Sequence, residues 1–268
     1  MEVKIYETLM NEWLPLMAEQ AKTSLGTDVR FADSQELLDE FDHVETLWQK
    51  RHTHADAQAV HHKANEIAVA RELLGKMGVN DTLRYEPPLR ATKKSIDFLI
   101  TTSDGLRNWI DVKTVNPDWV DEDDERAAGE WERFNAFVEK AGRRFSVITN
   151  MAGIAGQMVK TPWIFARRTF DLEHKQTLLE GDERGAVALL FCGNGFAFHR
   201  SDAEDFADFY KTGKFRLDDW SGAHLPEYMA NEGYELKRTL AGFHYLERKQ
   251  FDVDASLRLW VRGPIEFA

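Results

Sequence analysis

Residues 95–115 read SIDFLITTSDGLRNWIDVKTV, in which two apolar stretches flank a short polar segment. The segment Ser103–Gly105 places aspartate before glycine, a sequence typical of tight turns. The flanking stretches, 95–101 and 106–115, are rich in apolar and aromatic residues and have the length of strands. These residues therefore predict an antiparallel hairpin.

Three charged residues interrupt this apolar hairpin. Side chains alternate between the two faces of a strand, so Asp111 and Lys113 share one face of an otherwise apolar strand. Asp97 interrupts the preceding strand, and the hairpin brings it opposite Asp111. Two close carboxylates repel each other unless a proton or a cation lies between them. Hard oxygen ligands suit Mg²⁺ or Mn²⁺, which makes this pair a candidate metal site.

A third acid lies in the helix that we expect before the hairpin, over residues 56–77. At about 100° per residue, Glu66 lies on the apolar arc of this helix, together with Ala70, Leu73 and Met77. That arc must pack on the sheet, and an unpaired carboxylate buried there costs several kcal/mol. A metal ion shared with Asp97 and Asp111 would supply the missing partner.

The remaining elements indicate an α/β fold, a mixed β-sheet with helices packed on it. They are helices at 33–50 (with Asp33 or Ser34 as N-cap), 165–180 and 202–212, and strands at 82–86, 186–191 and 196–198. An alternative places a second core helix at 129–142 and a fourth strand at 145–149. We prefer the later pair because 186–191 is the stronger buried strand.

Composition limits the classes of protein to consider. The chain has 268 residues, a net charge of -12 and 43% hydrophobic residues, which excludes wholesale disorder. Its single cysteine, Cys192, excludes an intramolecular disulfide, and we expect a cytoplasmic protein. No segment has the roughly 18 apolar residues of a membrane span, so no membrane partner is expected. Proteins that coat nucleic acid are usually basic, so contact with a polyanion would need local basic patches or bound metal ions.

Glu66, Asp97 and the pair Asp111-x-Lys113, in the order helix, strand and hairpin, resemble the PD-(D/E)XK nuclease superfamily. The helix NEIAVARELLGKMG resembles the first core helix of that family, and SIDFLI with NWIDVKTV resembles its central hairpin. The serine and isoleucine before Asp97 depart from the family, which most often has proline in its first motif. The resemblance covers residues 55–115 and, more weakly, 165–200.

This resemblance implies a restriction-endonuclease-like fold, a mixed β-sheet core flanked by helices. The regions that it implies are an N-terminal helical region (1–54), a nuclease-like core (55–200) with an insertion around 117–162, and a C-terminal α+β extension (201–268). The extension would pack on the core.

The resemblance also implies metal-dependent hydrolysis of phosphodiester bonds, of DNA and by an endonuclease, with Mg²⁺ or Mn²⁺ as cofactor. Asp97 and Asp111 would ligate one or two ions, helped by the backbone carbonyl of Val112. Glu66 would assist them, directly or through water. Lys113 would hold or deprotonate the attacking water. Exonuclease activity stays open, as do RNase and junction-resolvase activities on the same residues.

Nucleic-acid contacts are expected from two segments. Lys93 and Lys94 lead into the strand of Asp97, so they would stand beside the site. The second core helix of this family often carries a polar residue toward the site, and here Lys175 and Gln176 are the candidates, with Gln176 preferred. A homodimer would supply two sites for cleavage of both strands. A regulatory protein partner is left open, and phage defence is among the roles common in the family.

Two rival interpretations need no metal. Asp97, Asp111 and Lys113 could form a cross-strand salt bridge on a solvated sheet face. The corresponding function is a catalytically inactive binding or scaffolding protein that keeps the nuclease fold. Four histidines lie close together in the sequence: His52, His54, His61 and His62. We interpret them as part of a solvated helix start rather than a zinc site, because no adjacent Asp, Glu or Cys completes a tetrahedral set of ligands.

Overall fold

The computed structural model describes residues 22–114, 165–192 and 236–247, the backbone of 258–262, and isolated positions at 19 and between 203 and 211. The helices are α3 (Ser34–Arg51), α4 (His54–Lys76), a helix at 165–176 and the short 3-10 helix η2 (Gly181–Glu183). The strands are β1 (Thr82–Tyr85), β2 (Phe98–Thr101), β3 (Arg107–Thr114), β4 (Ala186–Cys192), β5 (Gly242–Glu247) and β6 (Arg258–Arg262). Within these ranges, no helix combines the length and the apolar character needed to cross a membrane.

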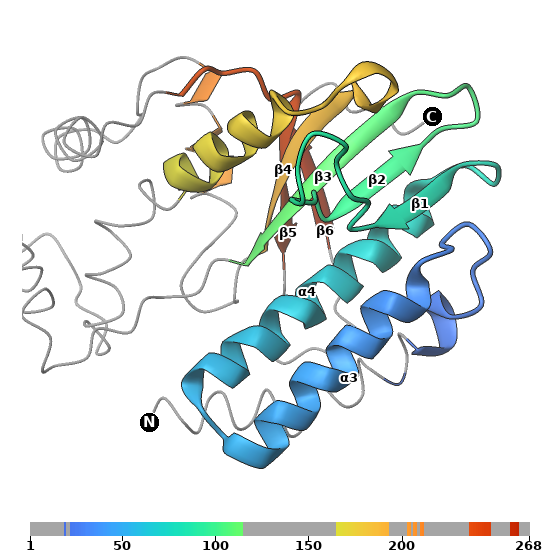
Figure 1. Ribbon diagram of the computed structural model, residues 1–268, viewed down its shortest axis with the longest axis vertical. Coiled ribbons are helices and arrows are strands. Elements are labelled where there is room, and N and C mark those ends of the chain that lie inside the picture. The colour runs from blue at the N-terminus through green and yellow to red at the C-terminus, as the bar shows by residue number, and fades with distance from the viewer. Residues whose placement is uncertain are drawn as a thin grey trace, which may run out of the picture.

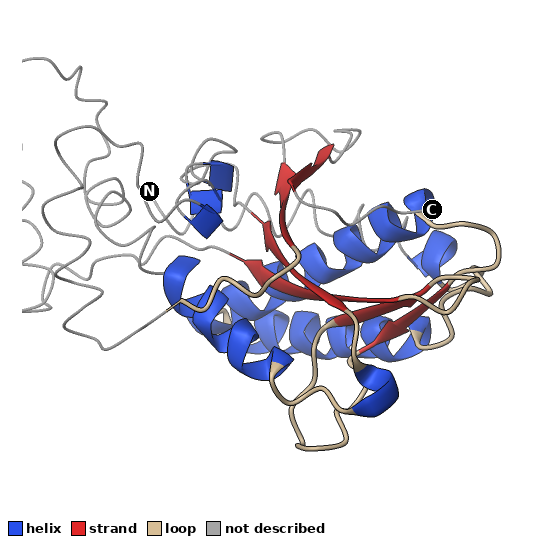
Figure 2. Ribbon diagram, turned by 90° about the horizontal axis from the view of Figure 1, so that it is seen from above, coloured by secondary structure: helices blue, strands red, loops and turns tan. Residues whose placement is uncertain are grey.

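The strands form one mixed sheet in the order β1-β2-β3-β4-β5-β6 (Figure 1). β2 is antiparallel to both β1 and β3, β4 is parallel to both β3 and β5, and β6 is antiparallel to β5. The strand direction rotates across the sheet, the usual right-handed twist of β-structure (Figure 2). The α/β class with a mixed sheet flanked by helices is therefore confirmed.

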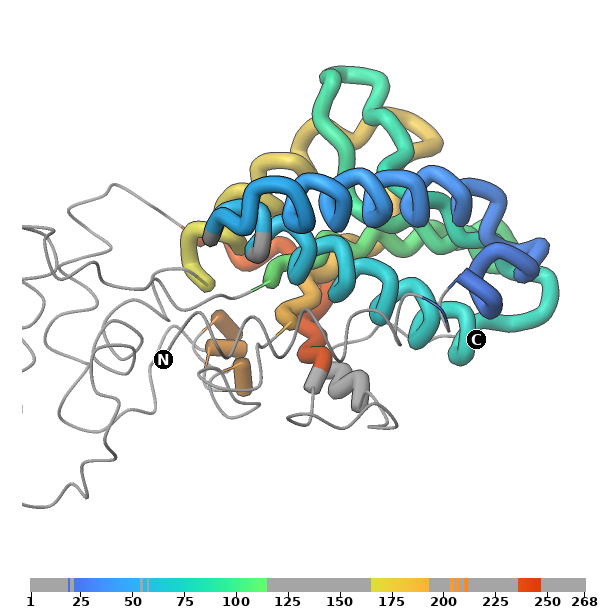
Figure 3. The backbone as a smooth tube through the Cα atoms, turned by 90° about the horizontal axis from the view of Figure 1, so that it is seen from below, coloured from blue at the N-terminus to red at the C-terminus, as the bar shows by residue number. Residues whose placement is uncertain are grey.

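Helices α3 and α4 lie side by side (Figures 1 and 3) because two caps reverse the chain between them. His52 ends α3 in the left-handed conformation, with φ of 51°, and its N–H donates to the carbonyl of Trp48. Thr53 then begins α4, and its hydroxyl accepts the backbone N–H of Asp56 at 3.2 Å. The left-handed C-cap His52 and the N-cap Thr53 are consecutive residues, so α3 and α4 run antiparallel with a short connection between them.

Asp33 lies at the predicted N-cap position of α3, but its side chain does not cap the helix. Its carboxylate instead accepts the backbone N–H of Tyr85 at 3.1 Å and forms an ion pair with Arg84. Because β1 lies against the start of α3, the strand supplies the donors, and Asp33 joins the helix to the sheet.

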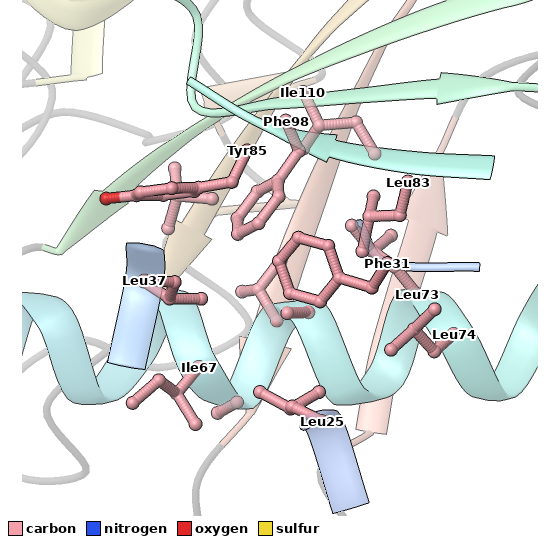
Figure 4. Packing of buried hydrophobic residues seen from close by; sticks show 14 of the residues in the cluster. Leu25, Phe31, Leu37, Ile67, Leu73, Leu74, Leu83, Tyr85, Phe98 and Ile110 are labelled. Atoms are coloured by element: carbon pink, nitrogen blue, oxygen red, sulfur yellow. The ribbon is translucent and has the colours of Figure 1, made fainter. Parts of the chain in front are cut away.

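Apolar cores cover both faces of the sheet. On the face of α3 and α4, the core includes Phe31, Leu37, Ile67, Leu73, Leu83, Phe98 and Ile110 (Figure 4). On the opposite face, the helix at 165–176 packs on a core that includes Leu99, Trp109, Phe165, Leu172, Leu189, Phe191 and Phe243. Alternate residues of β3 thus enter different cores, as the period of two predicts.

The hairpin is confirmed, with Phe98 of β2 opposite Ile110 of β3. Gly105 adopts a φ of 87° in the turn, a conformation that glycine adopts without steric cost. β2 begins at Phe98 rather than at residue 95. Before that point Ser95 pairs with Pro88 in an isolated bridge, because proline has no N–H to continue a ladder.

The structure contains the later of the two alternative helix–strand pairs, and the earlier pair lies outside the described residues. The helix ends at 176 rather than 180, and the predicted strand 186–191 is β4, parallel to β3. The C-terminal α+β extension is expected to pack on the core, and its strands β5 and β6 extend the sheet beyond β4. The expectations for 117–162, for 129–149 and for 193–198 lie outside the described residues.

His244 of β5 makes the stability of this sheet depend on pH. Its side chain is buried, and burial lowers the pKa of the imidazole to about 4. The unfolded chain takes up the proton near pH 6.5, so the folded state loses stability as the pH falls from there toward 4, by at most about 3 kcal/mol. We expect His244→Phe to lose less stability than the wild type in this range. Urea unfolding at pH 7 and at pH 4.5 measures the difference, with the exposed His43→Gln as control. Equal losses in His244→Phe and wild type would contradict the prediction.

Candidate functional site

Asp111 lies in β3, and its side chain is fully buried. Trp109, two residues earlier on the same face, belongs to the core under the helix at 165–176, so Asp111 faces that helix. Two ammonium groups contact its carboxylate. Lys113 Nζ lies 2.8 Å from Oδ2, and Lys175 Nζ donates to Oδ1 at 2.8 Å. One buried carboxylate is therefore paired with a lysine of its own strand and a lysine of the facing helix.

Asp97 lies opposite Asp111, as the hairpin predicts. It is one residue before Phe98, which pairs with Ile110, so the next pair along the register is Asp97 and Asp111. Its Oδ2 accepts the backbone N–H of Val112 at 2.5 Å. Burial raises the pKa of the Asp97 carboxyl to about 7, and the neighbouring charge of Asp111 adds to the rise. The repulsion expected from two adjacent acids is thus present.

The ammonium of Lys113 lies among three oxygens. It is 2.8 Å from Asp111 Oδ2 and 3.8 Å from Asp97 Oδ2, and it donates to the carbonyl of Val112 at 3.2 Å. Burial acts to lower the pKa of Lys113, but Asp97 and Asp111 outweigh it and raise the pKa. A cation therefore lies between the two carboxylates. These three oxygens are the ones that we expected to ligate a metal ion.

Glu66 is fully buried on α4, as its place on the apolar arc predicts. Its Oε2 accepts from Lys63 Nζ and from the Tyr85 hydroxyl, both at 2.9 Å, and its Oε1 lies 2.9 Å from His62 Nε2. Burial acts to raise the pKa of Glu66, but His62 and Lys63 outweigh it and lower the pKa. The partner of this buried acid is therefore a set of neighbours on α4 and β1.

Lys63 is the centre of what we call the Lys63 network: Glu40, Lys63, Glu66, Tyr85 and Glu86. Its Nζ lies 2.6 Å from Glu40 Oε2, 2.9 Å from Glu66 Oε2 and 3.9 Å from Glu86 Oε1. The Tyr85 hydroxyl lies 2.8, 2.9 and 3.3 Å from the same three oxygens, at the edge of the apolar core (Figure 4). Burial acts to lower the pKa of Lys63, whereas the glutamates raise it overall. One half-buried cation thus lies among several carboxylates.

Sequence reasoning missed the contribution of His62 and Lys63. His62 was expected to belong to a solvated helix start, but it contacts Glu66, and its Nδ1 lies 3.1 Å from Thr114 Oγ1. Asn65 Nδ2 donates to the same hydroxyl at 2.9 Å, so α4 is tied to the end of β3. The available signal was the spacing: residues three and four before Glu66 on a helix can reach its carboxylate.

The expected nucleic-acid contacts divide into three outcomes. Gln176, the preferred candidate, bonds through its amide to Thr239, at 3.3 Å through Nε2 and at 2.9 Å through Oε1, and its contact with nucleic acid stays a prediction. Adjacent helical residues point about 100° apart, and it is Lys175 that contacts the carboxylate of Asp111. Lys93 and Lys94 are exposed in the connection between β1 and β2.

The donors at this site fit a hard divalent cation. The carboxylates of Asp97 and Asp111 and the carbonyl of Val112 are oxygen ligands of the kind that Mg²⁺ prefers. Among the residues that the structure describes, no group of three or more His, Cys, Asp or Glu side chains is arranged to hold a metal ion. Comparisons with protein-family models, with curated proteins and with solved structures found no match for this chain.

Replacing Lys63 tests the Lys63 network. We expect Lys63→Met to lower the free energy of unfolding by about 3 kcal/mol, because Glu66 stays buried while its ammonium partner is removed. Adding Glu66→Gln should recover part of this loss, since a neutral amide needs no cation. Urea unfolding of the single and double variants measures both effects. Lys50→Met, on the exposed end of α3, is the control, and a loss no larger than its own would contradict the prediction.

Proposed function

We propose that this chain is a metal-dependent nuclease that hydrolyses phosphodiester bonds of DNA on a restriction-endonuclease-like, PD-(D/E)XK fold. The observation that carries the proposal is the Lys113 ammonium between the buried carboxylates of Asp97 and Asp111. Such a cluster has a high desolvation cost, and perturbed acids of this kind are found most often at functional sites. Paired acids with an adjacent lysine match the chemistry of metal-assisted phosphodiester hydrolysis.

The order of the elements supports the same proposal. α4 is followed by β1, β2 and β3, then by the helix at 165–176 and by β4. The first three strands form an antiparallel series, and β4 is parallel to β3. This is the succession that the family resemblance implies, with Glu66 on the first helix and the Asp-x-Lys pair on the third strand.

In the proposed reaction, Asp97, Asp111 and the carbonyl of Val112 would hold the divalent ion. When bound, the ion would lower the pKa of a water molecule and stabilise negative charge on the scissile phosphate. The raised pKa of Lys113 favours its protonated form. We therefore assign it the task of donating hydrogen bonds to the attacking water or to a phosphate oxygen, rather than that of a base.

Glu66 would act from beside the ion, through water. Lys63, Tyr85 and His62 hold its carboxylate, so its position is fixed before a ligand arrives. Its negative charge contributes to the raised pKa of Asp97. A fixed anion near Asp97 would add to the attraction for a divalent cation.

A binding or scaffolding protein is the second candidate function. Both oxygens of Asp111 already contact lysines, so the charges of the cluster are matched by the side chains themselves. A protein that keeps the fold for binding alone would need no more than this. Cleavage activity separates this candidate from the nuclease.

The experiment that tests the proposal incubates the full chain with supercoiled, linear and single-stranded DNA and with RNA. Each substrate is tested with Mg²⁺, with Mn²⁺ and with EDTA. Cleavage of DNA that requires the metal supports the proposal. Cleavage of RNA alone would reassign the substrate, and no cleavage with either metal would favour the binding protein.

A further inference from the structure

The buried carboxylate of Asp111 has a lysine on each of its oxygens. Lys113 belongs to the same strand, whereas Lys175 reaches across from the penultimate residue of the helix at 165–176. Two carboxylates face two ammonium groups, so the formal charges of this acid–lysine cluster sum to zero: Asp97, Asp111, Lys113 and Lys175. A neutral cluster in a chain of net charge -12 has little attraction for a phosphate backbone.

We propose, on the basis of the proposed nuclease function, that metal binding releases Lys175 from Asp111 and allows it to contact a phosphate. In the metal-free protein its ammonium neutralises Asp111. When a divalent cation takes the carboxylate oxygens, Lys175 leaves Asp111 and binds a phosphate of the DNA backbone next to the scissile one.

Charge balance gives the reason for the release. A divalent ion beside Asp111 would stand next to the Lys175 ammonium, which lies 2.8 Å from Oδ1, and like charges at such a distance repel strongly. Lys113 is bound between both acids and has the carbonyl of Val112 as a third contact. Lys175 donates a hydrogen bond to Asp111, its side chain is 19% exposed, and its long flexible stem can turn toward solvent.

The phosphate contact follows from what lies beside Lys175. Arg168 is seven residues earlier and therefore on the same side of the helix, and it is exposed. Lys175 contacts Asp111 from this side, so this side of the helix faces the cluster. Binding of a divalent cation would change the net charge of the cluster from zero to +2. The released Lys175 and Arg168 would then both face the phosphate backbone of the DNA.

The proposal makes the binding of metal and of DNA mutually dependent. Metal releases the lysine that DNA needs, and by linkage DNA must strengthen metal binding by the same factor. If Lys175 only held Asp111 in place, its removal would weaken the binding of metal and the binding of DNA together.

Lys175→Met distinguishes these cases because the two ligands should respond in opposite directions. We expect the affinity for Mn²⁺ alone, measured by titration calorimetry, to rise about tenfold, since the competing ammonium is gone. We expect the affinity for a short DNA duplex in Ca²⁺, measured by fluorescence anisotropy, to fall about tenfold. The slope of log affinity against log salt should decrease by about one, as for the loss of one phosphate contact.

Lys175→Gln repeats the test with an amide that can still donate to Asp111, and Lys76→Met, at the far end of α4, removes one charge away from the site. Lys76→Met should leave both affinities unchanged. A fall in Mn²⁺ affinity in both Lys175 variants, or an unchanged salt slope, would overturn the proposal. The nuclease function fails by a different result, the absence of metal-dependent cleavage by the wild type. Opposite changes in Mn²⁺ affinity and DNA affinity, without any cleavage by the wild type, would support the release of Lys175 by metal and contradict the proposed hydrolysis.

Discussion

Asp111→Asn is expected to reduce Mg²⁺-dependent DNA cleavage by about 10³-fold. The substitution preserves the shape of the side chain but removes the charge that would hold the metal ion, and several kcal/mol of transition-state stabilisation are lost with it. It also leaves Lys113 and Lys175 beside a neutral amide in a buried position, so a moderate loss of stability accompanies the loss of activity. Nicking of supercoiled plasmid with Mg²⁺ measures the rate, and circular dichroism checks the fold.

Asp39→Asn is the matched control, because Asp39 is an exposed acid on α3. It should cleave at the wild-type rate. Cleavage by Asp111→Asn within a few-fold of this control would remove Asp111 from the catalytic centre. The acid–lysine cluster would then be the salt bridge of a binding protein.

Lys113→Met is expected to reduce cleavage by about 10²-fold or more while metal binding is kept. Its ammonium would orient the attacking water or a phosphate oxygen, and removing a group of this kind typically costs that factor. The affinity for Mn²⁺ should stay the same or rise, because a cation between Asp97 and Asp111 has been removed. Asp111→Asn should instead lose Mn²⁺ binding, so the two variants separate the metal ligand from the reacting group.

Two measurements decide the prediction for Lys113. Single-turnover cleavage with saturating Mg²⁺ gives the loss in rate, and calorimetric titration with Mn²⁺ gives the metal affinity. Lys50→Met is the control for the loss of one surface charge. An unchanged rate at saturating metal would show that the lysine does no more than neutralise the acids.

The pairing of Asp97 with Asp111 was predictable from the sequence because it depends on local geometry. A turn at residues 103–105 sets the hairpin register, and the period of two puts Asp111 and Lys113 on one face. The burial of Glu66 was predictable in the same way from the helical period. These arguments need only neighbouring residues and the regular geometry of a strand or a helix.

The partners of those acids could not be predicted so directly. The Lys63 network brings Glu40 of α3 and Tyr85 of β1 to the carboxylate of Glu66. Glu40 and Tyr85 are far from Glu66 in sequence, and no helical or strand period places them beside it. Their meeting depends on how α3, α4 and β1 pack together.

Sequence periodicity was enough to predict the hairpin, the acids that it aligns and the helix that buries Glu66, because backbone geometry acts over a few residues. That Lys175 rather than Gln176 contacts Asp111 depends instead on tertiary packing. The rotation of that helix is set by Phe165 and Leu172, which are buried in the core on the sheet. A rotation set by packing against distant strands cannot be read from the helix alone, because every residue of the core contributes to it.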